Sequence, residues 1–98
     1  MNLLQDLLAD IKRVHPAFPS EPIEKAFELA NRSHGTQMRK SGEPYIIHPV
    51  EVVRIIIGMN LDLPSIVAGL LHDVVEDTLV KLPEIKKEFG EEVAFLVD

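Results

Sequence analysis

Apolar side chains recur at helical spacing over the first third of the chain. One stripe predicts a helix over residues 2–14, and His15-Pro16 ends it because the residue before proline disfavours helical backbone angles. A second stripe predicts a helix with Ser20 as its N-cap and Pro22 in its first turn, ending near Gly35. The two stripes contain Leu3, Leu4, Leu7, Leu8, Ile11 and Val14, then Ile23, Ala26, Phe27 and Ala30.

The second half of the chain repeats the same signals. A proline in the first helical turn opens each of three further segments with apolar stripes, and a glycine follows two of them as a stop signal. The expected helices cover residues 49–58, 64–76 and 83–90, and another begins at residues 91–98.

Alternation with a period of two residues is not sustained in any segment, so we expect an all-α fold, a bundle of about five to six helices. Residues 35–45 lack apolar periodicity and contain two glycines and a proline, which indicates an ordered loop. At 98 residues the chain forms one domain at most. Because it stops as a helical pattern starts, we expect the bundle to be incomplete at its C-terminus.

The composition of the chain disfavours several classes of function. A net charge of −6 disfavours general affinity for nucleic acid, so only a local basic patch could bind phosphate. The chain has no cysteine, which leaves histidine, carboxylates and backbone oxygens as metal ligands. The apolar runs are too short to cross a bilayer, and the N-terminal residues do not resemble a secretory signal. We therefore expect a soluble, cytoplasmic protein without a membrane partner.

The expected helix 64–76 has a polar arc opposite an aliphatic one. Steps of 100° per residue bring Gly69, His72, Asp73, Glu76 and Asp77 onto the polar side. One imidazole and three carboxylates within about two turns favour a bound cation. Glycine at position 69 indicates that something approaches the helix closely there. The alternative interpretation is a solvent-facing polar surface.

A basic loop precedes the expected third helix. Arg39, Lys40 and Ser41 offer charged and hydroxyl donors to phosphate oxygens, although an ordinary exposed turn would have the same composition. His48 stands at the junction of loop and helix, where it could join His72 and Asp73 in a mixed nitrogen and oxygen site. Such a site suits manganese, iron, zinc or magnesium.

Three segments carry a family resemblance: HGTQMRKSGEPYIIHP at 34–49, LLHDVVEDT at 70–78 and EIKKEFGEEVAFLVD at 84–98. In them the chain resembles the N-terminal HD-type hydrolase domain of RelA/SpoT-type stringent-response enzymes, with residues 1–20 as a lead-in helix and 21–98 as the HD core. Thr36 departs from the glycine common at that place.

The resemblance implies roles for individual residues. His48, His72 and Asp73 correspond to metal ligands, the ion usually being manganese, and Glu76 and Asp77 to the acidic pair implicated in catalysis. Arg39, Lys40 and Ser41 correspond to the loop that grips a guanine nucleotide. The family takes a fourth ligand, an aspartate, from a helix beyond the last residue of this chain.

The implied activity is metal-dependent hydrolysis of the 3′-pyrophosphate of (p)ppGpp to GDP or GTP and pyrophosphate, within a bifunctional synthetase/hydrolase. Three alternatives stay open: another HD nucleotide phosphohydrolase, a non-catalytic nucleotide-binding or regulatory fragment, and a fragment that associates with itself. A substrate panel, nucleotide binding without turnover, and concentration-dependent sedimentation would distinguish them.

Overall fold

The computed structural model describes residues 2–35, 37–38, 42–59, 61–78 and 80–98, with the side chain of Asp77 left out. Within these ranges the secondary structure is helical, and the single isolated β-bridge pairs Met38 with Pro44. The all-α prediction is confirmed. The elements are α1 (Leu3–Val14), α2 (Glu21–His34), α3 (Ile47–Ile56), the 3-10 turn η1 (Ile57–Met59), α4 (Leu63–Leu71), α5 (Val74–Asp77), α6 (Leu82–Phe89) and α7 (Glu91–Val97).

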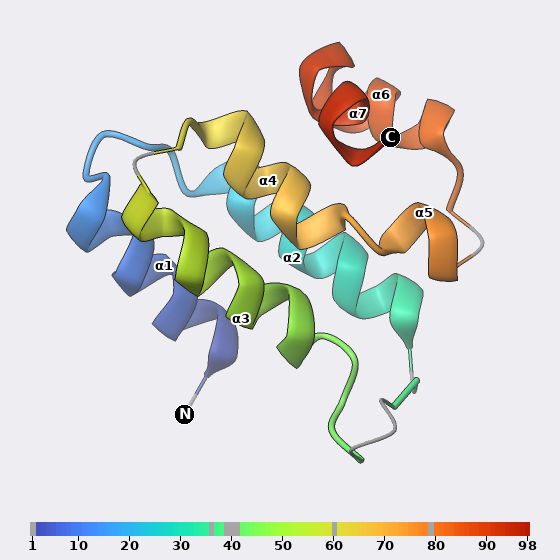
Figure 1. Ribbon diagram of the computed structural model, residues 1–98, viewed down its shortest axis with the longest axis horizontal. Helices are drawn as coiled ribbons and strands as arrows, with labels where there is room; N and C mark the ends of the chain where they lie inside the picture. The colour runs from blue at the N-terminus through green and yellow to red at the C-terminus, as the bar shows by residue number, and fades with distance from the viewer. Residues whose placement is uncertain (1, 36, 39–41, 60, 79) are drawn as a thin grey trace.

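Helix α4 lies at the centre of the packing, with α2 and α3 against it and α7 against its remaining side (Figure 1). Its apolar residues Ile66, Val67, Leu70 and Leu71 are at most 2% exposed. A helix that is apolar over most of its circumference must be surrounded on most sides. This arrangement fixes the C-terminal end of α4 relative to α2 and α3.

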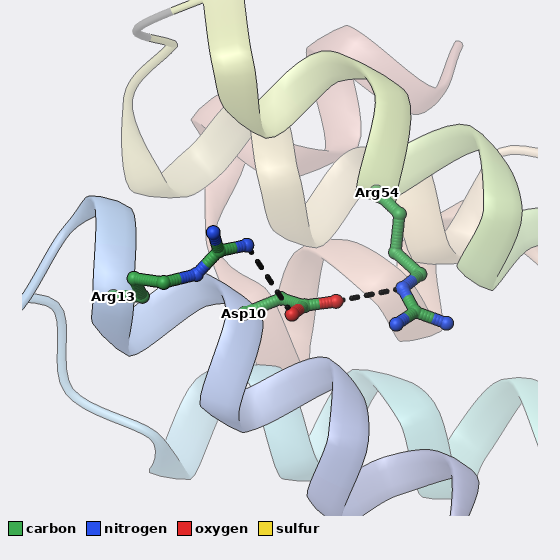
Figure 2. Close-up of polar contacts among 3 residues, drawn as sticks. All are labelled: Asp10, Arg13 and Arg54. Atoms are coloured by element: carbon green, nitrogen blue, oxygen red, sulfur yellow. Dashed lines mark hydrogen bonds and ion pairs between the residues drawn. The ribbon is translucent and has the colours of Figure 1, made fainter.

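Helix α1 lies beside α3 and closes one side of the bundle (Figure 1). The side chain of Asn2 caps it by accepting a hydrogen bond from the N–H of Gln5, and Leu7 and Ile11 face the core. Asp10 on α1 accepts a 2.7 Å hydrogen bond from Nε of Arg54 on α3 (Figure 2). The lead-in helix is thus joined to the body by both apolar and ionic contacts.

The helix expected over 64–76 is interrupted. Helix α4 ends at Leu71, a turn contains His72 and Asp73, and α5 begins at Val74. Asp73 has φ −97° and ψ −5°, still in the right-handed helical region but displaced from the centre of it. The prediction of one continuous helix over 64–76 was therefore wrong, because two helices are joined there through His72 and Asp73.

Smaller corrections concern helix ends. Helix α3 begins at Ile47, two residues before Pro49, and the 3-10 turn η1 continues it past the expected glycine stop at position 58. Ser20 is the N-cap residue of α2, as predicted, but its side chain makes no capping hydrogen bond.

The close approach predicted at Gly69 exists, but the neighbour is helix α3. A Cβ placed on Gly69 would lie 3.1 Å from Cγ2 of Val53 and 3.3 Å from Cδ1 of Ile56. Glycine therefore lets α3 and α4 pack closely, and it serves the core instead of a ligand. No helix in the described part of the chain is both long and apolar enough to span a membrane.

Candidate metal centre

Three polar side chains meet where the start of α3 approaches the end of α4. His48 comes from α3, and His72 and Asp73 come from the turn between α4 and α5. Oδ2 of Asp73 lies 3.1 Å from Nε2 of His72 and 3.8 Å from Nε2 of His48. One candidate ligand atom from each residue lies within 4.8 Å of the other two. The predicted ligand set is therefore brought together in space.

The break after Leu71 positions two of the three ligands. Packing of α3 on α4 brings His48 to the same end of the bundle, and the fully buried Val50 and Val53 anchor α3 there. His48 is held at the first turn of α3, where its backbone N–H donates to the carbonyl of Tyr45 at 3.2 Å. The three side chains thus rest on packed helix ends.

The orientation of the His72 ring follows from one hydrogen bond. Nδ1 of His72 lies 2.7 Å from the carbonyl oxygen of Gly69, and because a carbonyl only accepts, Nδ1 carries the proton. In the neutral imidazole, Nε2 then has a free lone pair, and it is Nε2 that faces Asp73. Backbone contacts of this kind fix the tautomer of metal-binding histidines.

The donor set fits a divalent cation. Two imidazole nitrogens and one carboxylate oxygen suit zinc, manganese and iron, and nitrogen or oxygen ligands lie about 2.0–2.2 Å from zinc. Separations of 3.1 and 3.8 Å between ligand atoms are compatible with a shared ion at such distances. All three side chains are partly accessible, so a substrate could reach an ion held there.

Among the other predicted site residues, the structure describes the side chain of Glu76 alone. Glu76 lies on α5 and is exposed, and its carboxylate is not part of the cluster of candidate ligands. Asp77 is the last residue of α5, but its side chain lies outside the described part of the structure. Arg39, Lys40 and Ser41 also lie outside it.

The structure adds one residue to which the sequence assigned no defined role. His34, at the end of α2, is buried, and its ring stacks on that of Tyr45 with centroids 4.2 Å apart. Nδ1 of His34 lies 3.0 Å from Oε1 of Gln37. The signal was its spacing: His34 follows Ala30 by four residues and continues the buried stripe of α2.

Comparison with known proteins places the chain in a family. A family model described as "HD domain" matches residues 26–98. The chain is 43% identical over 96 residues to a probable GTP pyrophosphokinase of Mycobacterium leprae, an alignment covering 98% of this chain and 12% of that protein.

Two further relatives are named guanosine-3′,5′-bis(diphosphate) 3′-pyrophosphohydrolase. The protein from Aquifex aeolicus is 45% identical over 91% of this chain and 13% of its own length. The protein from Borreliella burgdorferi is 51% identical over 83% of this chain and 12% of its own length. The chain thus spans about an eighth of the length of these relatives. It belongs to the HD-domain family and is related over nearly its whole length to enzymes of the RelA/SpoT type.

Proposed function

We propose that this chain is part of a metal-dependent hydrolase that removes the 3′-pyrophosphate of (p)ppGpp. The observation that carries the proposal is the convergence of His48, His72 and Asp73 at one end of the bundle. The names of the Aquifex and Borreliella relatives support this substrate class. A cluster of ligands on packed helix ends is typical of sites that hold their geometry during a reaction.

His48, His72 and Asp73 are proposed to hold a divalent cation, with manganese as the expected ion. When bound, the ion supplies a Lewis acid that offsets negative charge on the phosphoryl oxygens. The chain's own contribution is the orientation of the ligands: the Gly69 carbonyl keeps Nε2 of His72 directed at the site. Oδ2 of Asp73 lies 3.1 Å from Nε2 of His72 and 3.8 Å from Nε2 of His48, so one ion can contact all three residues.

Glu76 and Asp77 are proposed to orient the attacking water and accept its proton. The water oxygen forms a bond to phosphorus, the bond between phosphorus and the 3′ oxygen breaks, and that oxygen leaves as the 3′ hydroxyl after taking up a proton. The products are GDP or GTP and pyrophosphate. Arg39, Lys40 and Ser41 are proposed to hold the anionic nucleotide.

The proposed domain plan has residues 1–20 as a lead-in helix and 21–98 as part of an HD core. The proposed partner is a free guanosine polyphosphate in the cytoplasm, with no direct role for nucleic acid. Self-association of the chain is a separate expectation, which sedimentation at several concentrations would test.

The test combines metal binding with turnover. Manganese is titrated into the purified chain and followed by electron paramagnetic resonance, with His48→Ala as the control. Release of pyrophosphate from ppGpp is then followed by phosphorus-31 NMR, with His72→Ala as the inactive control. Saturable binding that depends on His48, together with turnover that depends on His72, supports the proposal. Turnover by His72→Ala at the wild-type rate would rule it out.

The same experiment separates the other interpretations. Hydrolysis of other nucleotides with ppGpp left intact would favour a different HD phosphohydrolase. Nucleotide binding without turnover would favour a binding or regulatory module. The chain spans only 12% of the M. leprae relative named a probable GTP pyrophosphokinase, and nucleotide synthesis is not proposed for these residues.

A further inference from the structure

His34 combines deep burial with an unpaired nitrogen. It is the buried polar residue of the described core, at 3% exposure, and its Nε2 has no hydrogen-bond partner. Buried polar atoms are nearly always paired, so an unpaired one calls for an explanation. Phenylalanine would fill a similar space without burying a polar atom. The explanation therefore lies in what the rest of the imidazole does.

The imidazole contacts the segments on both sides of the loop that follows α2. We call residues 37–38 the first stem and residues 42–45 the second stem of this loop. Its Nδ1 contacts Oε1 of Gln37 on the first stem, and its face stacks on Tyr45 at the end of the second. Backbone hydrogen bonds close the same region: the N–H of Gln37 donates to His34 and the N–H of Tyr45 donates to Gln37, at 2.9 and 3.1 Å. The bridge between Met38 and Pro44 lies next to them.

The second stem leads directly into the metal centre. Tyr45 is followed by a turn in which Ile47 donates to the carbonyl of Pro44 and His48 donates to that of Tyr45, both at 3.2 Å. Only two residues separate the ring stacked on His34 from the candidate ligand His48. A shift of Tyr45 would therefore be transmitted through these hydrogen bonds to the first turn of α3.

We propose that His34 is a positioning residue of the metal centre: by stacking under Tyr45 and binding Gln37, it fixes the turn from which His48 enters the site. The inference rests on the proposed function, since it requires His48 to be a metal ligand. His34 is not itself a ligand, because its Nε2 is buried away from solvent and its Nδ1 is engaged by Gln37. Its effect on metal binding is indirect.

Two substitutions separate positioning from simple packing. His34→Gln removes the ring that stacks on Tyr45, and we expect manganese affinity to fall about tenfold, the lower end of the effect of removing a supporting residue around a metal site. His34→Phe keeps a ring under Tyr45 but loses the hydrogen bond to Gln37, so its affinity is expected to lie between those of the wild type and His34→Gln. Phe27→Leu is the matched control, because Phe27 lies on the same helix two turns earlier and belongs to the buried core cluster.

Manganese dissociation constants and melting temperatures are measured for all variants and the wild type. We expect Phe27→Leu to lower the melting temperature without changing affinity, and His34→Gln to weaken affinity beyond any loss of stability. If His34→Gln does not fold, Tyr45→Leu removes the same stack from its other side. Wild-type affinity in a folded variant that lacks the stack would overturn the inference. Absence of His48-dependent binding in the wild type would instead overturn the proposed metal centre.

Discussion

The carbonyl oxygen of Gly69 lies 2.7 Å from Nδ1 of His72, one helical turn further along the chain. This contact assigns the proton to Nδ1 and leaves Nε2 to face Asp73. His72→Ala should therefore abolish saturable manganese binding while the helices stay folded, because the imidazole is partly exposed and its removal leaves no buried cavity. Metal titration and circular dichroism measure the two effects. Unchanged binding would show that the ion is held elsewhere.

Glu76 and Asp73 should differ in what they contribute. Asp73→Asn removes a charged ligand atom and is expected to lose both metal binding and hydrolysis. Glu76→Gln is expected to keep metal affinity, because Glu76 lies outside the ligand cluster, and to lower turnover by about 100-fold or more, the usual contribution of a general base. Manganese titration beside ppGpp hydrolysis makes the comparison. Equal loss of metal affinity in both variants would contradict separate roles.

Gly69→Ala should destabilise the bundle by roughly 1 kcal/mol. Alanine gains about 1 kcal/mol in helix propensity, but overpacking a core typically costs about 1–3 kcal/mol. The new Cβ would lie 3.1 Å from Cγ2 of Val53, which is fully buried and has little room to move. Urea denaturation measures the change.

Val53→Ala provides the control for this explanation. It removes the atom that the new Cβ would meet, so the double variant should be more stable than the two single changes predict, with a coupling of about 0.5–3 kcal/mol. Strict additivity would show that the contact with Val53 is not the cause.

The ion pair between α1 and α3 should matter little to stability. Asp10 contacts Arg54 at 2.7 Å and Arg13 at 3.4 Å, but the Arg54 side chain is 45% exposed (Figure 2). Asp10→Asn is expected to cost less than about 1 kcal/mol, and the cost should shrink at about 1 M salt, where screening acts over roughly 3 Å. Arg13→Gln, which removes the longer and more exposed pair, should cost less still. A larger, salt-independent loss would show that α1 is held mainly through Asp10.

Asp62 should make α4 sensitive to acid. The hydroxyl and the backbone N–H of Ser65 both donate to Oδ1 of Asp62. These hydrogen bonds hold the pKa of the Asp62 carboxyl below its usual 3.8, and the hydroxyl has the larger effect. Because the folded pKa is the lower one, the stabilisation is fully present above 3.8 and is lost as the pH falls through the folded value.

Asp62→Asn should therefore lower the melting temperature at neutral pH, and the difference from wild type should diminish in strong acid. Ser65→Ala removes the larger of the two hydrogen-bond effects and should reduce the same pH dependence. A difference that stays constant as the solution is acidified would contradict this origin.

Helix positions could be predicted well because their signals are local. Proline in the first turn and apolar stripes located the starts of α2, α4 and α6 to within about one residue, whereas the end expected for α4 near Glu76 was wrong. The break after Leu71 has no such signal, since His72 and Asp73 are neither glycine nor proline. The surroundings of the chain change at this point: α5 packs against α2, whereas α4 is surrounded by α2, α3 and α7.

The candidate ligands could be named from the sequence, but their geometry could not. His48 lies 24 residues before His72, and only the packing of α3 on α4 brings them together. The tautomer of His72 depends on a backbone carbonyl that no residue pattern reveals. The stacking of His34 on Tyr45 could not be predicted either, because it depends on the backbone hydrogen bonds that link Gln37 to His34 and Tyr45 to Gln37.

The turn at His72 and Asp73 also bears on engineering. Neighbouring side chains on a regular helix point about 100° apart, so the distances from Oδ2 of Asp73 to the two imidazoles depend on the backbone angles of this turn. Substitutions that merge α4 and α5 into a longer, more regular helix would change the direction of the Asp73 side chain relative to His48. Selection of variants for thermal resistance alone does not protect this geometry, so a library built on this chain should be screened for cation binding in the same round.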